Sequence, residues 1–198
     1  MGFPMAGWLS KNGYSVAVYN RTTSVAKKWL DTYAGSMASS PSTAAADAEI
    51  VFVCVGNDND VLEVVCGEKG ILSGIKQGAI LVDHTTTSAE LAKELAVKVK
   101  KHHCEFVDAP VSGGQQGAEN GQLTVMCGGD EIIFNRVTDA INCYAKALNL
   151  LGPVGSGQLC KMVNQICIAG LVQGLAEGLN FAQRAGLDAH QVIDVISK

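Results

Sequence analysis

The chain has 198 residues, of which 47% are hydrophobic and 17% are charged, and its net charge at pH 7 is −4. A chain of this length forms one domain of ordinary size, or one domain with part of a second, and on folding buries roughly 70% of its unfolded surface. The composition excludes a disordered chain. The acidic charge gives no reason to expect nucleic acid or an anionic membrane as a partner.

The seven cysteines form no C-x-x-C pair and lie mostly in apolar runs. We therefore expect buried, reduced thiols in a cytoplasmic protein, with disulfide or metal use as the alternative. The first 13 residues lack the basic region and long apolar stretch of a signal peptide. Polar residues interrupt the most apolar segment, 162–182, so we expect it to be a poor membrane span.

Helical and strand patterns alternate through the first 150 residues. The predicted helices are residues 3–12, 23–33, 59–65, 88–101 and 131–145. The predicted strands are residues 14–20, 49–55, 79–83, 104–107 and 123–127, and 149–151 ends the alternation. The nearly continuous apolar run at 49–55 is typical of a strand covered on both faces. This order predicts an α/β fold with a doubly wound parallel sheet.

The pattern changes at Gly155. A helix without a breaker is predicted from residue 156 or 157 to about 185, followed by a shorter helix at 189–198 that Asp188 caps. Three glycines, at positions 170, 174 and 178, form one stripe on the long helix. Because each glycine costs about 1 kcal/mol against alanine in a helix, the stripe predicts that another helix packs closely there.

Two segments point to a dinucleotide site. Gly2 opens a helix and fits the third glycine of a G-x-G-x-x-G turn, although the preceding strand and two glycines of that pattern are not in this chain. The end of the next strand has no acidic residue to bind the ribose 2′-hydroxyl of NAD. It offers Arg21 between Asn20 and Thr22 instead, which favours the 2′-phosphate of NADP; a solvated arginine in a turn is the alternative.

Two further segments suit substrate chemistry. Ser112, Gly113 and Gly114 follow a buried strand, and their hydroxyl and backbone N–H groups could hold a carboxylate, or form an ordinary glycine turn. Lys161 is followed by two amides on the same helix face, Asn164 and Gln165. It is either a proton donor whose pKa apolar neighbours lower (Leu159, Met162 and Val163) or a surface group. The four histidines show no metal-ligand spacing, and we expect no metal.

Together these segments closely resemble the β-hydroxyacid dehydrogenases, a family that includes 3-hydroxyisobutyrate dehydrogenase, tartronate semialdehyde reductase and glyoxylate/succinic semialdehyde reductase. The segments are, in order, MGFPMA (1–6), YNRT (19–22), DAPVSGG (108–114), GQLTVMCGG (121–129) and GPVGSGQLCKMVNQ (152–165). The more distant 6-phosphogluconate dehydrogenase branch differs. It has Gly-Pro-Ser where this chain has Gly121-Gln122-Leu123, and His-Asn where this chain has Asn164-Gln165.

The resemblance implies a Rossmann-type domain over residues 1–154, and over 155–198 an interdomain helix with the beginning of an all-helical domain. It implies that Lys161 is the catalytic lysine, that Ser112, Gly113 and Gly114 hold the substrate carboxylate, and that Asn164 and Gln165 orient the substrate. The cofactor contacts it implies are Gly2, Asn20, Arg21, Thr22, Val55, Gly56, Asp60 and Thr86.

The expected activity is hydride transfer between NADP(H), or less favourably NAD(H), and a small 3-hydroxyacid or its semialdehyde. Val55-Gly56 stands where many relatives have Leu-Pro, which leaves that contact to the backbone. Relatives also continue beyond residue 198 into the helical domain that makes most of the dimer, so a homodimer or tetramer is expected of the full-length protein. The alternatives are a non-catalytic cofactor-binding module and an inactive fragment of the enzyme.

Overall fold

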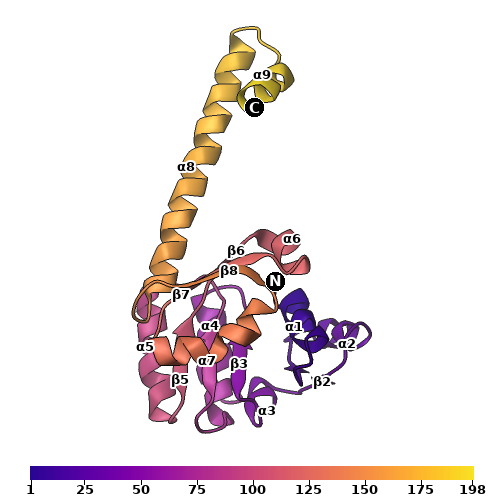
Figure 1. Ribbon diagram of the computed structural model, residues 1–198, viewed down its shortest axis with the longest axis vertical. Helices are drawn as coiled ribbons and strands as arrows, with labels where there is room; N and C mark the ends of the chain where they lie inside the picture. The colour runs from indigo at the N-terminus through magenta and orange to yellow at the C-terminus, as the bar shows by residue number, and fades with distance from the viewer. The chain divides into compact units, whose positions relative to one another are not determined.

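The structure, a computed structural model, describes all 198 residues (Figure 1). It has two compact units, Met1–Lys161 and Met162–Lys198. The helices are α1 (Gly2–Lys11), α2 (Thr23–Leu30), α3 (Pro41–Ala45), α4 (Asp58–Cys66), the 3₁₀ turn η1 (Ile71–Ser73), α5 (Ala89–Lys101), α6 (Gly114–Glu119), α7 (Glu131–Asn142), α8 (Ser156–Arg184) and α9 (Ala189–Ile196). The strands are β1 (Ala17–Val18), β2 (Ser36–Met37), β3 (Ile50–Val53), β4 (Ile80–Asp83), β5 (Glu105–Asp108), β6 (Val111–Ser112), β7 (Leu123–Cys127) and β8 (Ala145–Leu150).

Most strands pair in parallel. Strands β3, β4 and β5 form one parallel ladder in that order, with Val53 opposite Asp83 and Asp83 opposite Asp108. Strand β1 pairs with β2, and β7 pairs with β8, also in parallel. Only β6 runs antiparallel to its neighbour, β7. The predicted α/β class with a mainly parallel sheet is confirmed.

Both faces of the central ladder are covered by helices. Alternate side chains of β4 point to opposite faces, so Ile80 and Val82 pack in one apolar cluster with Ile141 of α7. Leu81 packs in a second cluster with Leu95 of α5. Two separate cores on one sheet are the physical signature of a doubly wound fold.

Strand β3 is less covered than its apolar sequence predicts. Of its four residues only Val53 is buried, and Ile50, Val51 and Phe52 are half-buried. Since β3 pairs with β4 alone, its second edge carries no neighbouring strand and both faces stay partly open. Ile50 and Phe52 nevertheless pack against one apolar cluster and Val51 against the other, so both faces of β3 are covered as expected, although incompletely.

Several elements differ from the sequence pattern because they are short or depend on distant partners. Strands β2 and β6 have two residues each and were not predicted, nor were α3 and α6. The first predicted strand, 14–20, shrinks to Ala17–Val18. Residue 145, predicted as the end of a helix, begins β8, because α7 ends at Asn142 and the chain then pairs along β7.

The second unit contains most of α8 and all of α9. Asp188 caps α9 as predicted, since its Oδ1 accepts from His190 N at 2.8 Å. Nothing lies within 4 Å of the position a Cβ would occupy on Gly170, Gly174 or Gly178, so no helix of this chain packs on the glycine stripe.

Helix α8 is long and apolar enough to cross a membrane by length and composition, with a mean hydropathy of 1.3 over 18 residues. By this criterion alone, the helix is not the poor membrane span that the sequence predicts. Core helices of water-soluble proteins meet the same criterion, so it does not establish a membrane span.

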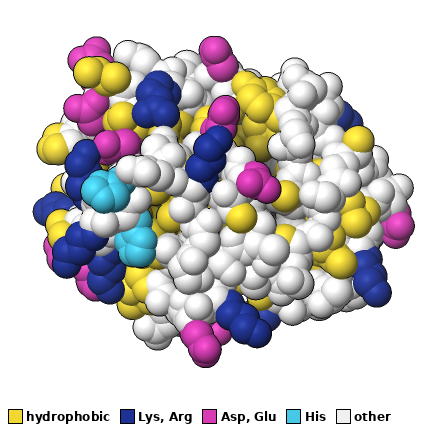
Figure 2. Space-filling model, turned by 90° about the horizontal axis from the view of Figure 1, so that it is seen from below, with side chains coloured by type: hydrophobic (Ala, Val, Ile, Leu, Met, Phe, Trp, Pro, Cys, Tyr) yellow, Lys and Arg dark blue, Asp and Glu magenta, His cyan; other side chains and the backbone are white.

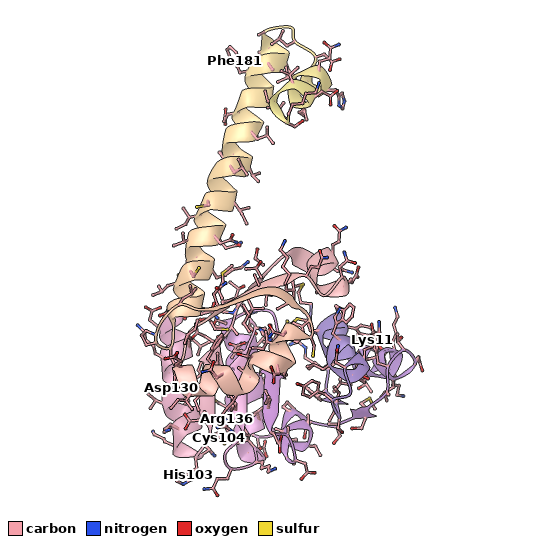
Figure 3. The ribbon with its side chains drawn as sticks, in the orientation of Figure 1. Lys11, His103, Cys104, Asp130, Arg136 and Phe181 are labelled. Atoms are coloured by element: carbon pink, nitrogen blue, oxygen red, sulfur yellow. The ribbon has the colours of Figure 1, made fainter.

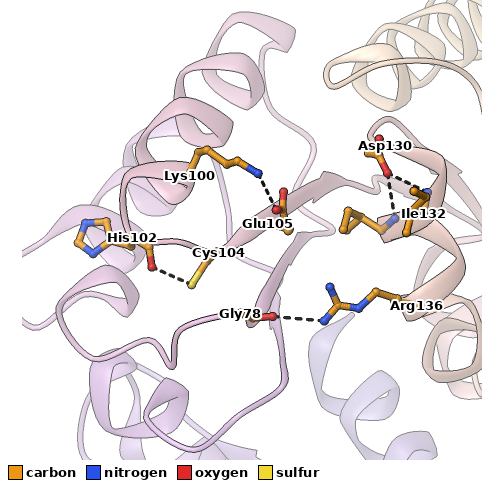
Figure 4. Close-up of polar contacts among 9 residues, drawn as sticks. Gly78, Lys100, His102, Cys104, Glu105, Asp130, Ile132 and Arg136 are labelled. Atoms are coloured by element: carbon orange, nitrogen blue, oxygen red, sulfur yellow. Dashed lines mark hydrogen bonds and ion pairs between the residues drawn. The ribbon is translucent and has the colours of Figure 1, made fainter.

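Helix α5 ends in a basic turn beside the start of β5. Lys100 Nζ lies 2.6 Å from Glu105 Oε1, and Arg136 of α7 donates to Gly78 O at 3.3 Å (Figure 4). His103, labelled in Figure 3, has a φ of 56° and reverses the chain into β5. Figure 2 shows this side of the molecule, where histidine side chains lie among lysine and arginine side chains.

Candidate active site

The N-terminus of α1 lies at the carboxyl end of β3. A Cβ on Gly2 would lie 3.4 Å from Cys54 Cβ, so the glycine allows the close approach of helix and strand end. No side chain caps α1, and its first turn contains no acidic residue. Pro4 has no N–H group, and Met5 N donates to Met1 O at 3.5 Å. Gly2 N–H faces the Cys54 thiol. The Phe3 N–H and the positive end of the helix dipole therefore remain at this end of α1, which suits an anion such as a pyrophosphate.

The loop after β1 brings Arg21 to Asp60. Asn20 Oδ1 accepts from Thr22 N at 2.8 Å, a local turn that presents the arginine between them. Arg21 Nη1 lies 3.4 Å from Asp60 Oδ1, and the two side chains are 79% and 26% exposed. Two predicted cofactor residues that are 39 positions apart in the sequence are thus in contact.

Asp60 is itself held in place at the start of α4. Asn57 caps this helix by accepting from Asp60 N at 3.0 Å, and Asn57 Nδ2 donates to Asp60 Oδ2 at 3.2 Å. A Cβ on Gly56 would lie 2.6 Å from the same Oδ2. The glycine is needed here because the carboxylate occupies the space that a side chain would take.

The loops after β3 and β4 are joined to each other. Val55 N donates to Thr85 Oγ1 at 3.1 Å. Thr86 is exposed, whereas its neighbours Thr85 and Thr87 are buried. The fold therefore presents Thr86 alone from this loop to solvent.

Two buried oxygen atoms at this edge have no protein partner: Asp83 Oδ2 and Thr87 Oγ1. The other carboxylate oxygen, Asp83 Oδ1, accepts from Thr85 N at 2.9 Å. Burial raises the pKa of Asp83 to about 7, and the nearby carboxylate of Asp108 acts in the same direction. An incompletely satisfied, buried polar site is uncommon in a stable core.

Asp108 joins the end of β5 to the start of α8. Its side chain is fully buried; Oδ1 accepts from Gly155 N at 2.7 Å and Oδ2 from Gln158 N at 3.0 Å. Burial raises the pKa of this carboxyl, and the backbone donors oppose that rise. A carboxylate at a helix N-terminus also interacts favourably with the helix dipole.

Gln158 joins the same helix to the loop that presents Thr86. This fully buried amide accepts from Thr87 N at 3.0 Å through Oε1 and donates to Thr85 O at 2.7 Å through Nε2. The first turn of α8 is therefore fixed to two strand ends.

Lys161 follows on the next turn and is 9% exposed. None of the three ion pairs of the chain involves it, and burial lowers the pKa of its ammonium group. The direction agrees with the sequence prediction, but the predicted cause does not. The apolar neighbours Leu159, Met162 and Val163 are 51%, 37% and 60% exposed, so they do not form the surroundings that bury the lysine.

The predicted carboxylate loop has the expected glycine geometry. Ser112 pairs with Thr124 of β7, and Gly113 and Gly114 have φ values of 124° and 62°, which other residues rarely adopt. Both glycines are exposed at the start of α6. No hydrogen bond joins this loop to the other predicted site residues.

The two predicted amides belong to the second unit. Asn164 Nδ2 donates to Gln165 Oε1 at 3.3 Å, three and four residues beyond Lys161 on α8. The contacts therefore bring together Arg21 with Asp60, and tie the helix of Lys161 to the loop of Thr86.

The sequence prediction missed a buried histidine that supports this edge. His84 Nδ1 lies 2.6 Å from Ala109 O and Nε2 lies 2.8 Å from Tyr144 Oη. Because a carbonyl only accepts, the proton is on Nδ1 and Tyr144 donates to Nε2. Burial lowers the pKa of His84 to about 4, so the ring is neutral at pH 7.

Some of the missed residues could have been found from the sequence, and others could not. Asp83 ends one predicted strand and Asp108 directly follows the next, positions where polar groups meet at the edge of a parallel sheet. Nothing in the sequence around Gln158 indicates its two partners more than 70 residues away.

Comparison with known proteins gives consistent matches along the whole chain. Residues 1–155 match the family described as the NAD binding domain of 6-phosphogluconate dehydrogenase. Residues 155–198 match the family described as NAD-binding of NADP-dependent 3-hydroxyisobutyrate dehydrogenase.

An uncharacterized oxidoreductase of Shewanella frigidimarina is 60% identical over all 198 residues, which cover 68% of its length. A probable 3-hydroxyisobutyrate dehydrogenase-like protein of Arabidopsis thaliana is 43% identical, with 59% of its length covered. The structure of Mycobacterium tuberculosis 3-hydroxyisobutyrate dehydrogenase with L-serine superposes on the whole chain with a TM-score of 0.91 and 28% identity, and 66% of that chain is covered.

The chain thus spans 59–68% of the length of these relatives. Its fold, its two family matches and its identity to the Shewanella protein agree with each other and with the resemblance found in the sequence motifs. The chain belongs to the β-hydroxyacid dehydrogenase family, a family of NAD-binding oxidoreductases related to 3-hydroxyisobutyrate dehydrogenase.

Proposed function

We propose that the protein transfers a hydride between NADP(H) and a small 3-hydroxyacid or its semialdehyde, with Lys161 as general acid and base. The observation that carries this proposal is the state of Lys161. This lysine is nearly buried as a residue and has no carboxylate partner, and its helix is bonded to the ends of β4 and β5.

The residues at the carboxyl edge fit a nicotinamide dinucleotide. The start of α1 offers the Phe3 N–H and the positive end of the helix dipole to a pyrophosphate, and Asn20, Arg21 and Thr22 offer donors to a 2′-phosphate. When bound, the cofactor supplies or accepts the hydride.

Lys161 moves the proton that accompanies the hydride. In the reducing direction its ammonium group donates to the substrate carbonyl oxygen, and in the oxidising direction the neutral amine accepts the hydroxyl proton. Burial lowers the pKa of the lysine, which makes the neutral amine easier to reach near neutral pH. The absence of an ion pair supports this role because the group stays free to bind substrate.

The remaining predicted residues bind and orient. In this proposal the N–H groups of Gly113 and Gly114 and the hydroxyl of Ser112 hold the substrate carboxylate, while Asn164 and Gln165 orient the oxygen that reacts. Gly2, Val55, Gly56, Asp60 and Thr86 contact the cofactor.

We place the cofactor domain at residues 1–154 and the interdomain helix with the start of a helical domain at 155–198. We further propose that the full-length protein is a cytoplasmic homo-oligomer. The family match described as NADP-dependent supports the choice of cofactor.

The test uses the complete gene product and NADPH-dependent reduction of a series of small semialdehydes. Lys161→Ala should lower kcat by at least about a hundredfold, the usual range for loss of a general acid, and leave NADPH affinity within about twofold. Lys146→Ala, which removes an exposed lysine of β8, is the matched control and should change neither quantity. Unchanged turnover in the Lys161 variant would reject the role of this residue. Cofactor binding without turnover of any hydroxyacid or semialdehyde would favour a binding module.

A further inference from the structure

The contact between Arg21 and Asp60 suggests how the cofactor is chosen. A site for NAD offers a carboxylate to the ribose 2′-hydroxyl, whereas a site for NADP offers an arginine to the 2′-phosphate. The strand end at 16–22 contains only the arginine. The fold supplies the missing acid from α4 and places its Oδ1 3.4 Å from Arg21 Nη1.

We propose that Arg21 and Asp60 together set the preference between NADP(H) and NAD(H), with Asp60 favouring NAD(H) and opposing NADP(H). This inference rests on the proposed function, because it assumes that the dinucleotide binds at this edge. It assigns to Asp60 a specificity-determining role rather than a general contact.

The charges explain the opposing effects. The guanidinium group has five N–H donors, and the one contact with Asp60 leaves most of them free on a side chain that is 79% exposed. A 2′-phosphate that binds Arg21 comes close to the Asp60 carboxylate, because that carboxylate is in contact with the same guanidinium group. The two negative charges then repel each other. The ribose 2′-hydroxyl of NAD(H) can instead donate a hydrogen bond to this carboxylate.

Asp60 cannot easily turn away from such a ligand. Asn57 holds its Oδ2 and its backbone N–H, and the Cα of Gly56 packs where only a hydrogen fits beside that oxygen. The carboxylate is therefore a fixed feature of the site, and its charge acts on every cofactor that reaches Arg21.

A purely structural role for Asp60 makes a different prediction. An acidic residue in the first turn stabilises a helix through the helix dipole. If Asp60 did only this, its replacement would change the binding of phosphorylated and unphosphorylated nucleotides by the same factor.

The experiment compares 2′,5′-ADP with 5′-AMP, two halves of NADP and NAD that differ by the 2′-phosphate, by isothermal titration calorimetry on the complete gene product. Asp60→Asn should raise the ratio of 2′,5′-ADP affinity to 5′-AMP affinity by about three- to tenfold, the range expected for an exposed pair of charges. Arg21→Gln should lower the same ratio by about tenfold or more. Asp60→Ser provides a second replacement, and thermal unfolding verifies that each variant is folded.

Glu94→Gln is the matched control, because it breaks an exposed ion pair with Lys98 on α5, and it should leave the ratio unchanged. An unchanged ratio in both Asp60 variants, with the wild-type protein still binding 2′,5′-ADP, would overturn this inference and leave the proposed function intact. Failure of the wild-type protein to bind either nucleotide would overturn the proposed function and this inference with it.

Discussion

Replacing Gln158 with leucine tests whether the amide joins the helix of Lys161 to the loop of Thr86. Leucine has a similar volume and is apolar, so it fills the site but makes neither of the two hydrogen bonds. Thr87 N and Thr85 O then lose partners that now lie 3.0 and 2.7 Å away. Because Gln158 is fully buried, water does not readily replace them.

The size of the effect follows from these two groups. A buried polar group left without a partner costs about 1–3 kcal/mol, so the two groups cost about 2–6 kcal/mol, and the gain from the apolar side chain leaves Gln158→Leu a loss of about 1–4 kcal/mol in the free energy of unfolding. That is a large part of the 5–15 kcal/mol typical of a domain.

Urea unfolding followed by tryptophan fluorescence measures this change, since both tryptophans, Trp8 and Trp29, lie in the first unit. A loss below about 1 kcal/mol would refute the reasoning. Gln158→Glu is the matched control: its second oxygen faces Thr85 O at neutral pH and gains a proton in acid. Its pKa is then raised by folding, so its stability should approach that of the wild-type protein below about pH 4.3 and fall as the pH rises.

Two further predictions concern His84 and His103. Folding lowers the pKa of His84 from 6.5 to about 4, so the unfolded chain takes up the proton first and the histidine should reduce stability by about 3 kcal/mol as the pH falls from 6.5 to 4. Asp83, with a raised pKa of about 7, acts in the opposite direction, so the measurement is the difference in unfolding free energy between wild type and His84→Gln. A difference that stays constant from pH 7 to 4 would contradict the assignment. His103→Gly should raise stability by about 0.5–1 kcal/mol in thermal unfolding, since φ of 56° strains a residue with a Cβ; a lower melting temperature would count against this.

The sequence predicted those elements whose signals are local. Residues 123–127 form a strand with the predicted bounds, and Asp188 caps its helix through its own side chain. Such features depend on neighbours within a few positions, which a pattern along the chain contains. Strand β2, with two residues, has no periodicity to detect, and β8 exists because β7 lies beside it.

The residues of the candidate site also divide into those with a local sequence signal and those whose partners lie far away in the sequence. Gly113, Gly114 and Lys161 belong to recognisable motifs. No motif indicates which residue lies beside a given charged side chain. Arg21 and Asp60 are 39 residues apart, and only the tertiary fold brings the loop after β1 beside the start of α4. Sequence reasoning therefore named both Arg21 and Asp60 as cofactor contacts, and missed that the two side chains are in contact with each other.

From these long-range contacts we expect that binding of the proposed cofactor and the position of Lys161 are linked. Ser88 Oγ donates to Asp58 Oδ2 at 2.6 Å, which ties the starts of α4 and α5. Gln158 then holds the residues on both sides of the exposed Thr86. A ligand that orders Thr86 thus bears on the first turn of α8, and a change at Gln158 should weaken cofactor binding as well as the positioning of Lys161. A residue that served only to stabilise the fold would lower the amount of folded protein and leave the dissociation constant of the folded fraction unchanged.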